Sequence, residues 1–75
     1  MTENVVFTAE WCGPCDQLKQ SDKFAQANVE VVDVEEENRM ANEYGVRSVP
    51  TLVTIEDDKP KKQVSGIQPI LDELD

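Results

Sequence analysis

The two cysteines of the chain lie three residues apart, in the segment Trp11-Cys12-Gly13-Pro14-Cys15. A chain of 75 residues buries only about 60% of the surface that its unfolded state exposes. A bridge between Cys12 and Cys15 would close a loop too short to constrain the unfolded chain much. The fold must therefore depend on a small apolar core, and we expect the cysteine pair to serve chemistry rather than stability.

Hydrophobic patterning along the chain alternates between strand and helix. Runs of β-branched and aromatic residues predict strands at 4–8, 29–34 and 51–56, with a weaker fourth strand at 61–65. Helical patterns extend from Pro14 to about Ala25 and over residues 35–45 and 66–74. The predicted fold is a single α/β domain over residues 1–75, in the order β-α-β-α-β-β-α, with a four-stranded mixed sheet flanked by three helices. The first two strands should be parallel, because a helix connects them, and the last two should form an antiparallel hairpin.

Several positions within these elements have a predicted role. The acidic residues 35–37 favour the first turn of the second helix, and Gly45 suits the residue just past its end. Met40 and Tyr44 are four residues apart and should face the core. Pro60 places the last strand at an edge of the sheet. The last helix should turn one apolar stripe toward the core, made of Ile67, Ile70, Leu71 and Leu74.

The charge balance excludes some classes of partner. The chain has 16 acidic and 7 basic residues and a formal net charge of -9, so we expect neither nucleic acid nor an anionic membrane as a partner. The amino-terminal residues have no signal-peptide pattern, and no apolar run approaches a membrane span, so we expect a cytoplasmic protein. The acidity has two interpretations: an ordinary soluble surface, or adaptation to a salt-rich cytosol.

A close cysteine pair in a cytoplasmic protein is typical of redox activity or metal binding. A zinc site needs about four ligands, and the chain has no histidine and no further cysteine, so a complete site would need two chains. Cys12 falls at the start of the first predicted helix, where free N–H groups and the helix dipole favour a thiolate. Cys15 lies one turn later on the same side and could attack a mixed disulfide on Cys12. The pattern therefore favours a redox pair, with a shared metal site or an inert pair as the alternatives.

The segment "WCGPC" resembles the active-site signature of thioredoxins, and "EYGVRSVPTLVTIEDDKPKKQVSG", residues 43–66, resembles the second half of that family. The resemblance implies a minimal thioredoxin fold without the strand and helix with which full-length thioredoxins begin. It implies that Cys12 is the attacking thiol, that Cys15 is the resolving thiol, and that Pro50 is cis and packs against the pair. It also implies a docking surface for disulfide substrates, made of Trp11, Gly13, Pro14, Val49, Pro50, Gly66 and Ile67.

Four positions depart from the thioredoxin pattern. Val6 replaces the buried aspartate that accepts the proton of the resolving thiol, and Val31 replaces the lysine that pairs with it. Thr8 replaces an aromatic residue, and Asp16 replaces the basic residue after the second cysteine. The resemblance therefore implies a competent exchange centre whose second step is not accelerated by a buried carboxylate.

The predicted function is thiol–disulfide exchange on protein disulfides by a monomer, with no metal and no organic cofactor, because the two cysteines hold the electrons. An unidentified reductase or a small thiol should supply those electrons. The main alternative is a glutaredoxin-type enzyme that uses a small thiol, although one glycine before Ile67 and an acidic surface fit glutathione poorly. The other alternative is a non-catalytic binding module of the same fold.

Overall fold

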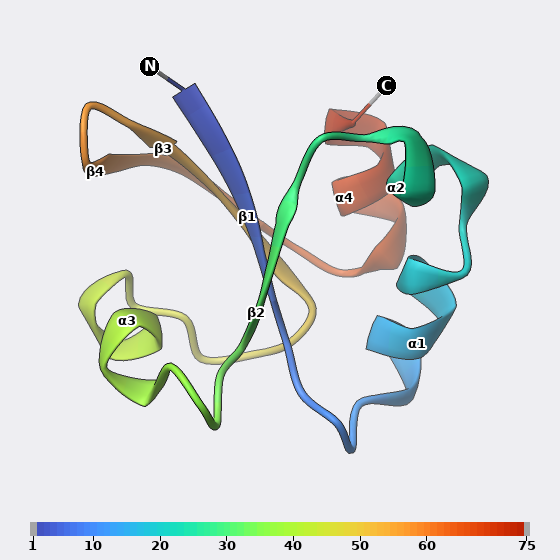
Figure 1. The fold of residues 1–75 in the computed structure, drawn as a ribbon, viewed down its shortest axis with the longest axis horizontal. Helices are drawn as coiled ribbons and strands as arrows, with labels where there is room; N and C mark the ends of the chain where they lie inside the picture. The colour runs from blue at the N-terminus through green and yellow to red at the C-terminus, as the bar shows by residue number, and fades with distance from the viewer. Residues whose placement is uncertain (1, 75) are drawn as a thin grey trace.

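The structure is a computed structural model that describes residues 2–74, so the first and last residues of the predicted domain, Met1 and Asp75, lie outside the described residues. Its strands are β1 (Thr2–Thr8), β2 (Glu30–Asp33), β3 (Thr51–Glu56) and β4 (Lys59–Ser65). Its helices are α1 (Gly13–Lys19), α2 (Asp22–Gln26), α3 (Asn38–Glu43) and α4 (Ile67–Glu73). The sheet has the strand order β2-β1-β3-β4, with α3 on one face and α1, α2 and α4 on the other (Figure 1).

The strand pairing confirms the predicted mixed sheet. β1 and β2 are parallel, while β3 is antiparallel to both β1 and β4. Thr8 lies opposite Asp33 and Phe7 lies opposite Thr51, so the end of β1, the end of β2 and the start of β3 meet at one end of the sheet. β4 is an edge strand, as Pro60 predicted, and its register with β3 shifts near that residue.

The predicted helix from Pro14 to about Ala25 is interrupted. α1 ends at Lys19, and Ser21 adopts an extended conformation (φ -71°, ψ 135°) before α2 begins. Leu18 and Phe24 are six residues apart, which in a continuous helix would place their side chains about 120° apart around the helix axis. The interruption lets both side chains reach the same core cluster. The described residues therefore form four helical segments, because one of the three predicted helices is divided in two.

The second predicted helix is shorter than its sequence pattern indicated. Residues 35–37 form a turn rather than the first helical turn, and α3 begins at Asn38. Glu36 and Glu37 both donate their backbone N–H groups to the carbonyl of Asp33, which holds this turn against the end of β2. Gly45 follows the end of the helix with φ 69°, as predicted.

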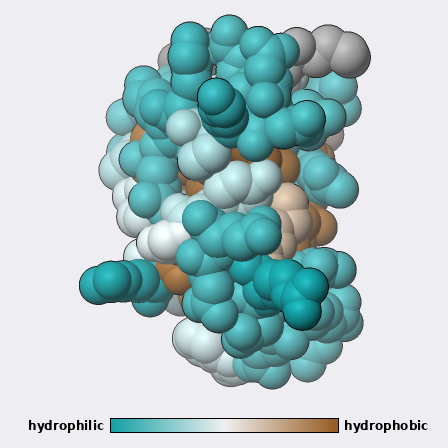
Figure 2. Space-filling view, turned by 90° about the vertical axis from the view of Figure 1, so that its left-hand side faces the viewer, coloured by the Kyte–Doolittle hydropathy of each residue, from teal (hydrophilic) through white to brown (hydrophobic). Residues whose placement is uncertain are grey.

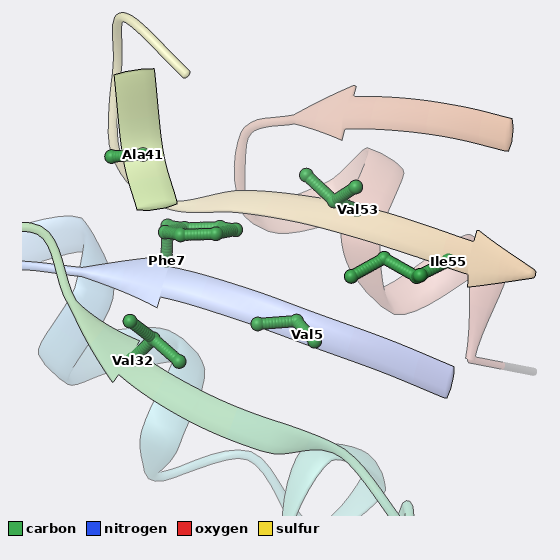
Figure 3. Close-up of a cluster of buried hydrophobic side chains, with 6 residues drawn as sticks. All are labelled: Val5, Phe7, Val32, Ala41, Val53 and Ile55. Carbon is green, nitrogen blue, oxygen red and sulfur yellow. The ribbon is translucent and has the colours of Figure 1, made fainter. Parts of the chain in front are cut away.

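Two apolar clusters lie on opposite faces of the sheet. The first packs α3 against the strands through Val5, Phe7, Val32, Ala41, Val53 and Ile55 (Figure 3). Met40 and Tyr44 pack against it as predicted, and the rings of Phe7 and Tyr44 meet edge-on with centroids 6.3 Å apart. The second cluster consists of Val6, Leu18, Phe24, Leu52 and Ile70, and the rest of the predicted α4 stripe packs against it.

The face of the molecule that carries α3 and the β3–β4 hairpin is mainly hydrophilic (Figure 2). Figure 2 shows that hydrophobic residues emerge on this face only in a narrow band between polar ones. Among residues 2–74, no helix has the length and apolar character needed to cross a membrane.

Candidate active site

The cysteine pair lies at the end of the sheet where β1 stops. The chain turns after Ala9, whose carbonyl accepts the N–H of Cys12 across 3.2 Å. Cys12 then caps the start of α1, with an extended backbone (φ -93°, ψ 106°) and Pro14 in the first helical turn. The backbone N–H of Cys15 donates to Sγ of Cys12 across 3.1 Å. The N–H group at the helix start therefore points at the Cys12 sulfur, as the sequence predicted.

The two cysteines form a disulfide, so the structure shows the oxidised state of the pair. Their Cα atoms are 5.2 Å apart. Cys15 has no exposed surface, whereas Cys12 retains 4%. Ala9 completes this small cluster, and Val34 and Val49 pack against it. The surroundings of the pair are therefore apolar, and its accessible edge is on Cys12.

The loop before β3 forms the opposite wall of the site. The Val49–Pro50 peptide is cis, as the resemblance implied, and Pro50 is buried. The Pro50 carbonyl accepts the N–H of Gly66 across 3.1 Å, which ties the loop to the end of β4. Gly66 has φ 101°, a conformation that favours glycine, and Ile67 begins α4 with its side chain against the second core cluster.

Trp11 projects from the surface beside the pair. Its side chain is 70% exposed, and its indole N–H donates a hydrogen bond to the carboxylate of Glu35 in the turn after β2. Gly13 and Pro14 are also exposed. The predicted docking residues therefore come from three segments at one end of the molecule: the β1–α1 connection with the first turn of α1, the loop before β3, and the start of α4.

A cavity of about 240 Å³ opens beside Trp11. It lies between the turn after β2 with α3 on one side and the loop before β3 on the other. Its lining residues are Trp11, Val34, Glu35, Asn38, Ala41, Asn42, Val46, Arg47, Ser48 and Val49. Only Trp11 and Val49 of this set were predicted as docking residues. We call this cavity the groove.

The loop before β3 is held by contacts between hydroxyl groups, which the sequence analysis did not identify. Thr51 is 1% exposed, and its hydroxyl donates to the carbonyl of Ser48 across 2.6 Å. The same oxygen lies 3.1 Å from the hydroxyl of Ser65 at the end of β4. We call these contacts the hydroxyl bridge. Its only sequence signal is a threonine directly after Pro50, which strand propensity alone also explains.

The departures from the family pattern have clear structural positions. Val6 is fully buried in the second core cluster, and Val31 lies opposite it on β2 with 45% of its side chain exposed. The buried polar residues of the described chain are Thr8 and Thr51, so no carboxylate in residues 2–74 is buried near the pair. Within the same range, no three histidine, cysteine or acidic residues gather as metal ligands would.

Comparison with known proteins assigns the family. The family model described as Thioredoxin matches residues 3–74. The chain belongs to the thioredoxin family. It is 35% identical over 71 residues to a thioredoxin of Alicyclobacillus acidocaldarius and 37% identical over 71 residues to a thioredoxin of Staphylococcus aureus. Each alignment covers 87% of this chain and 68% of the relative.

Solved structures of thioredoxins have the same fold. A thioredoxin from Nicotiana alata is similar with a TM-score of 0.77 and 32% identity, over 97% of this chain and 66% of that one. A variant thioredoxin from Halobacterium salinarum is similar with a TM-score of 0.74 and 34% identity, over 97% of this chain and 71% of that one. The chain thus has the thioredoxin fold and spans about two thirds of the length of these relatives, and with its paired cysteines it is a thiol–disulfide oxidoreductase.

Proposed function

We propose that this chain reduces protein disulfides, with Cys12 as the attacking thiol and Cys15 as the resolving thiol. The observation that supports this assignment is the contact between the Cys15 N–H and the Cys12 sulfur at the start of α1. A hydrogen bond to sulfur is stronger when the sulfur is a thiolate, so the same contact favours the nucleophilic form of Cys12. Cys15 is completely buried, whereas Cys12 retains a small exposed edge.

The proposed cycle moves two electrons without any further group. The Cys12 thiolate attacks one sulfur of the substrate disulfide, and the other substrate sulfur leaves as a thiolate that takes up a proton. Cys15 then loses its proton and attacks the Cys12 sulfur, which releases the second substrate thiolate and leaves the Cys12–Cys15 disulfide. The dithiol of a reductase, or two molecules of a small thiol, then reduces the Cys12–Cys15 disulfide and is itself oxidised to a disulfide.

The second step must use a base other than a buried carboxylate. Val6 occupies the position of the family's proton acceptor, and its cluster is apolar. Water or a buffer base that reaches the pair along the exposed side of Cys12 would remove the Cys15 proton. We therefore expect resolution of the mixed disulfide, rather than its formation, to limit turnover.

The proposed substrates dock on the surface formed by Trp11, Gly13, Pro14, Val49, Pro50, Gly66 and Ile67. An extended substrate segment would pair with the backbone of Val49, which packs beside the cysteines. The proposed active form is a monomer. Its proposed location is a cytoplasm, because the dithiol form requires a compartment that keeps thiols reduced.

Two measurements test this function. Reduction of a protein disulfide with dithiothreitol as the electron donor should show catalytic turnover, which the Cys12→Ser variant should lose. The Cys15→Ser variant should instead form stable mixed disulfides with substrate proteins, because Cys12 can attack but nothing resolves the product. Lack of turnover with dithiothreitol would contradict the proposal in favour of a binding module, and dependence on glutathione would favour the glutaredoxin-type alternative.

A further inference from the structure

The charges at the active-site end of the molecule are mainly of one sign. Five exposed acidic residues lie in the β1–α1 connection, the first turn of α1 and the turn after β2, and we call them the acidic rim: Glu10, Asp16, Glu35, Glu36 and Glu37. Glu10 and Asp16 flank the cysteine motif, and the N–H of Asp16 bonds to the carbonyl of Cys12. Residues 35–37 follow β2, whose last residue, Asp33, lies opposite Thr8 at the end of β1. The segments that hold the acidic rim therefore lie at the same end of the sheet as the pair.

The basic residues near the rim are fewer. Arg47 lines the groove opposite Glu35, and Arg39 lies on α3 just after the rim. In the part of the chain that the structure describes, neither arginine forms an ion pair with a rim residue. The five rim carboxylates outnumber the cationic side chains of the neighbouring segments, which are Arg39, Arg47 and Lys19, so the local excess of charge is negative.

The lysines of the hairpin are distant from this entrance. Glu56 lies opposite Thr2 at the start of β1, so the β3–β4 turn is at the other end of the sheet from the cysteines (Figure 1). Two lysines of β4 are already paired, Lys61 with Glu56 at 3.0 Å and Lys62 with Glu73 at 2.5 Å. The positive charge of the hairpin is therefore partly compensated, and its turn lies at the end of the sheet away from the docking surface.

Building on the proposed function, we propose that the acidic rim selects substrate disulfides that are flanked by lysine or arginine. The groove beside Trp11 is open and directly borders Glu35, so a substrate segment that lies in it places its neighbouring side chains over the rim. A cleft lined by charges of one sign raises the local concentration of oppositely charged ligands and accelerates their association, by factors of about 10 to 1,000. The preferred substrate is therefore a basic segment of a protein, and the preference acts mainly by raising the rate of association.

The test compares three disulfide peptides that differ only in the residues flanking the cysteine: two lysines, two serines or two glutamates. The second-order rate constant for oxidation of the reduced protein is measured for each at about 20 mM and about 1 M potassium chloride. We expect the lysine peptide to react about tenfold faster than the serine peptide at low salt, and the glutamate peptide to react more slowly still. The lysine advantage should fall to less than about twofold at 1 M salt, where the Debye length is about 3 Å.

Two charge variants localise the effect. Glu36→Gln/Glu37→Gln removes two rim charges without touching the Trp11–Glu35 contact, and it should reduce the lysine-to-serine ratio severalfold. Asp57→Asn/Asp58→Asn removes two charges from the hairpin turn at the far end of the sheet. Asparagine also tolerates the positive φ values of these two residues. This variant should keep the lysine-to-serine ratio within about twofold of the ratio for the original protein.

Equal rates for the three peptides at low salt would overturn the charge preference while leaving the proposed function standing. An equal loss of the ratio in both variants would also overturn the assignment to the rim, because net charge alone would then explain it. Failure of all three peptides to react would refute the proposed function, and the rim proposal with it.

Discussion

Val6 and Val31 lie directly opposite each other in the parallel pair of β1 and β2, the first buried and the second partly exposed. Neighbouring strands are about 4.8 Å apart, so the two side chains are close enough to interact if both were replaced by longer polar groups. The pair occupies the positions where the thioredoxin pattern has an aspartate and a lysine. The chain therefore has two apolar side chains at positions where the family's pattern has a pair of opposite charges.

Val6→Asp should destabilise the fold, because it buries a carboxyl group among Val6's apolar neighbours without a partner. We expect a loss of at least about 2 kcal/mol in the free energy of unfolding, measured by urea denaturation. The Val6→Asn variant is the neutral control for shape and polarity. An unchanged stability of Val6→Asp would mean that this side chain is exposed, which contradicts its burial in β1.

Addition of Val31→Lys to Val6→Asp should restore part of the lost stability, because a buried carboxylate costs less when a cation lies beside it. The double variant should also resolve mixed disulfides faster than the original chain near neutral pH, measured by stopped-flow mixing with a disulfide peptide. A double-mutant cycle with no coupling between the two substitutions would show that the side chains do not meet across the strands.

The two thiols of the reduced protein should differ in reactivity. Cys12 receives the N–H of Cys15 and has an accessible edge, whereas Cys15 is completely enclosed. Iodoacetamide at neutral pH should therefore label Cys12 at least about tenfold faster than Cys15, as peptide mass mapping over time would show. Faster labelling of Cys15 would reverse the proposed roles.

The hydroxyl bridge should support docking of protein substrates more than the chemistry of the pair. Thr51→Val keeps the side-chain shape but removes the oxygen that contacts Ser48 and Ser65, which should cost about 1 kcal/mol of stability. Because the loop holds Val49, we expect a raised KM for a protein disulfide and an unchanged rate with a small disulfide such as cystine dimethyl ester.

The matched control for Thr51→Val is Thr54→Val on the same strand. The Thr54 hydroxyl bonds to Asn4 across 3.0 Å, toward the far half of β1 from the site. The Thr54→Val substitution should cost a similar amount of stability as Thr51→Val, and it should leave the KM for the protein disulfide unchanged. Equal KM values for the two variants would show that the bridge is only a structural contact.

Much of this molecule was predictable because the relevant signals are local. Residues 51–56 form β3 with the predicted bounds, since a β-branched run between Pro50 and an Asp-Asp turn leaves little other choice. The interruption at Ser21 was not predictable from the helical pattern, because it depends on Leu18 and Phe24 reaching the same cluster. The same applies to the start of α3, which is set by hydrogen bonds to Asp33 rather than by helix propensity.

Within the site, the sequence identified the residues whose role follows from chemistry or from a short motif, such as Cys12 and Cys15. It missed residues whose role depends on where the chain returns. Arg47 and Asn42 line the groove because α3 and the loop before β3 face each other across it. Ser65 meets Thr51 because β4 pairs with β3 in a particular register, and no periodic pattern encodes that contact.

Salt should stabilise the fold. The net charge of -9 over an accessible surface of 4978 Å² is about one uncompensated negative charge per 550 Å², and runs such as Glu35–Glu37 and Asp57-Asp58 place like charges on adjacent residues. Self-repulsion of this kind opposes the compact state. It is screened strongly as the Debye length falls from about 10 Å at 0.1 M salt to about 3 Å at 1 M.

We therefore expect the thermal midpoint to rise by about 5 °C or more between 0.1 M and 2 M potassium chloride, since about 1 kcal/mol shifts the midpoint of a domain this small by about 4–8 °C. The increase should continue through the molar range, as in a protein adapted to a salt-rich cytoplasm. The Glu36→Gln/Glu37→Gln variant should start from a higher midpoint and gain less, because part of its repulsion is already removed. A midpoint that is flat above a few tenths molar would instead identify an ordinary acidic protein, and it would leave the redox chemistry of Cys12 and Cys15 unaffected.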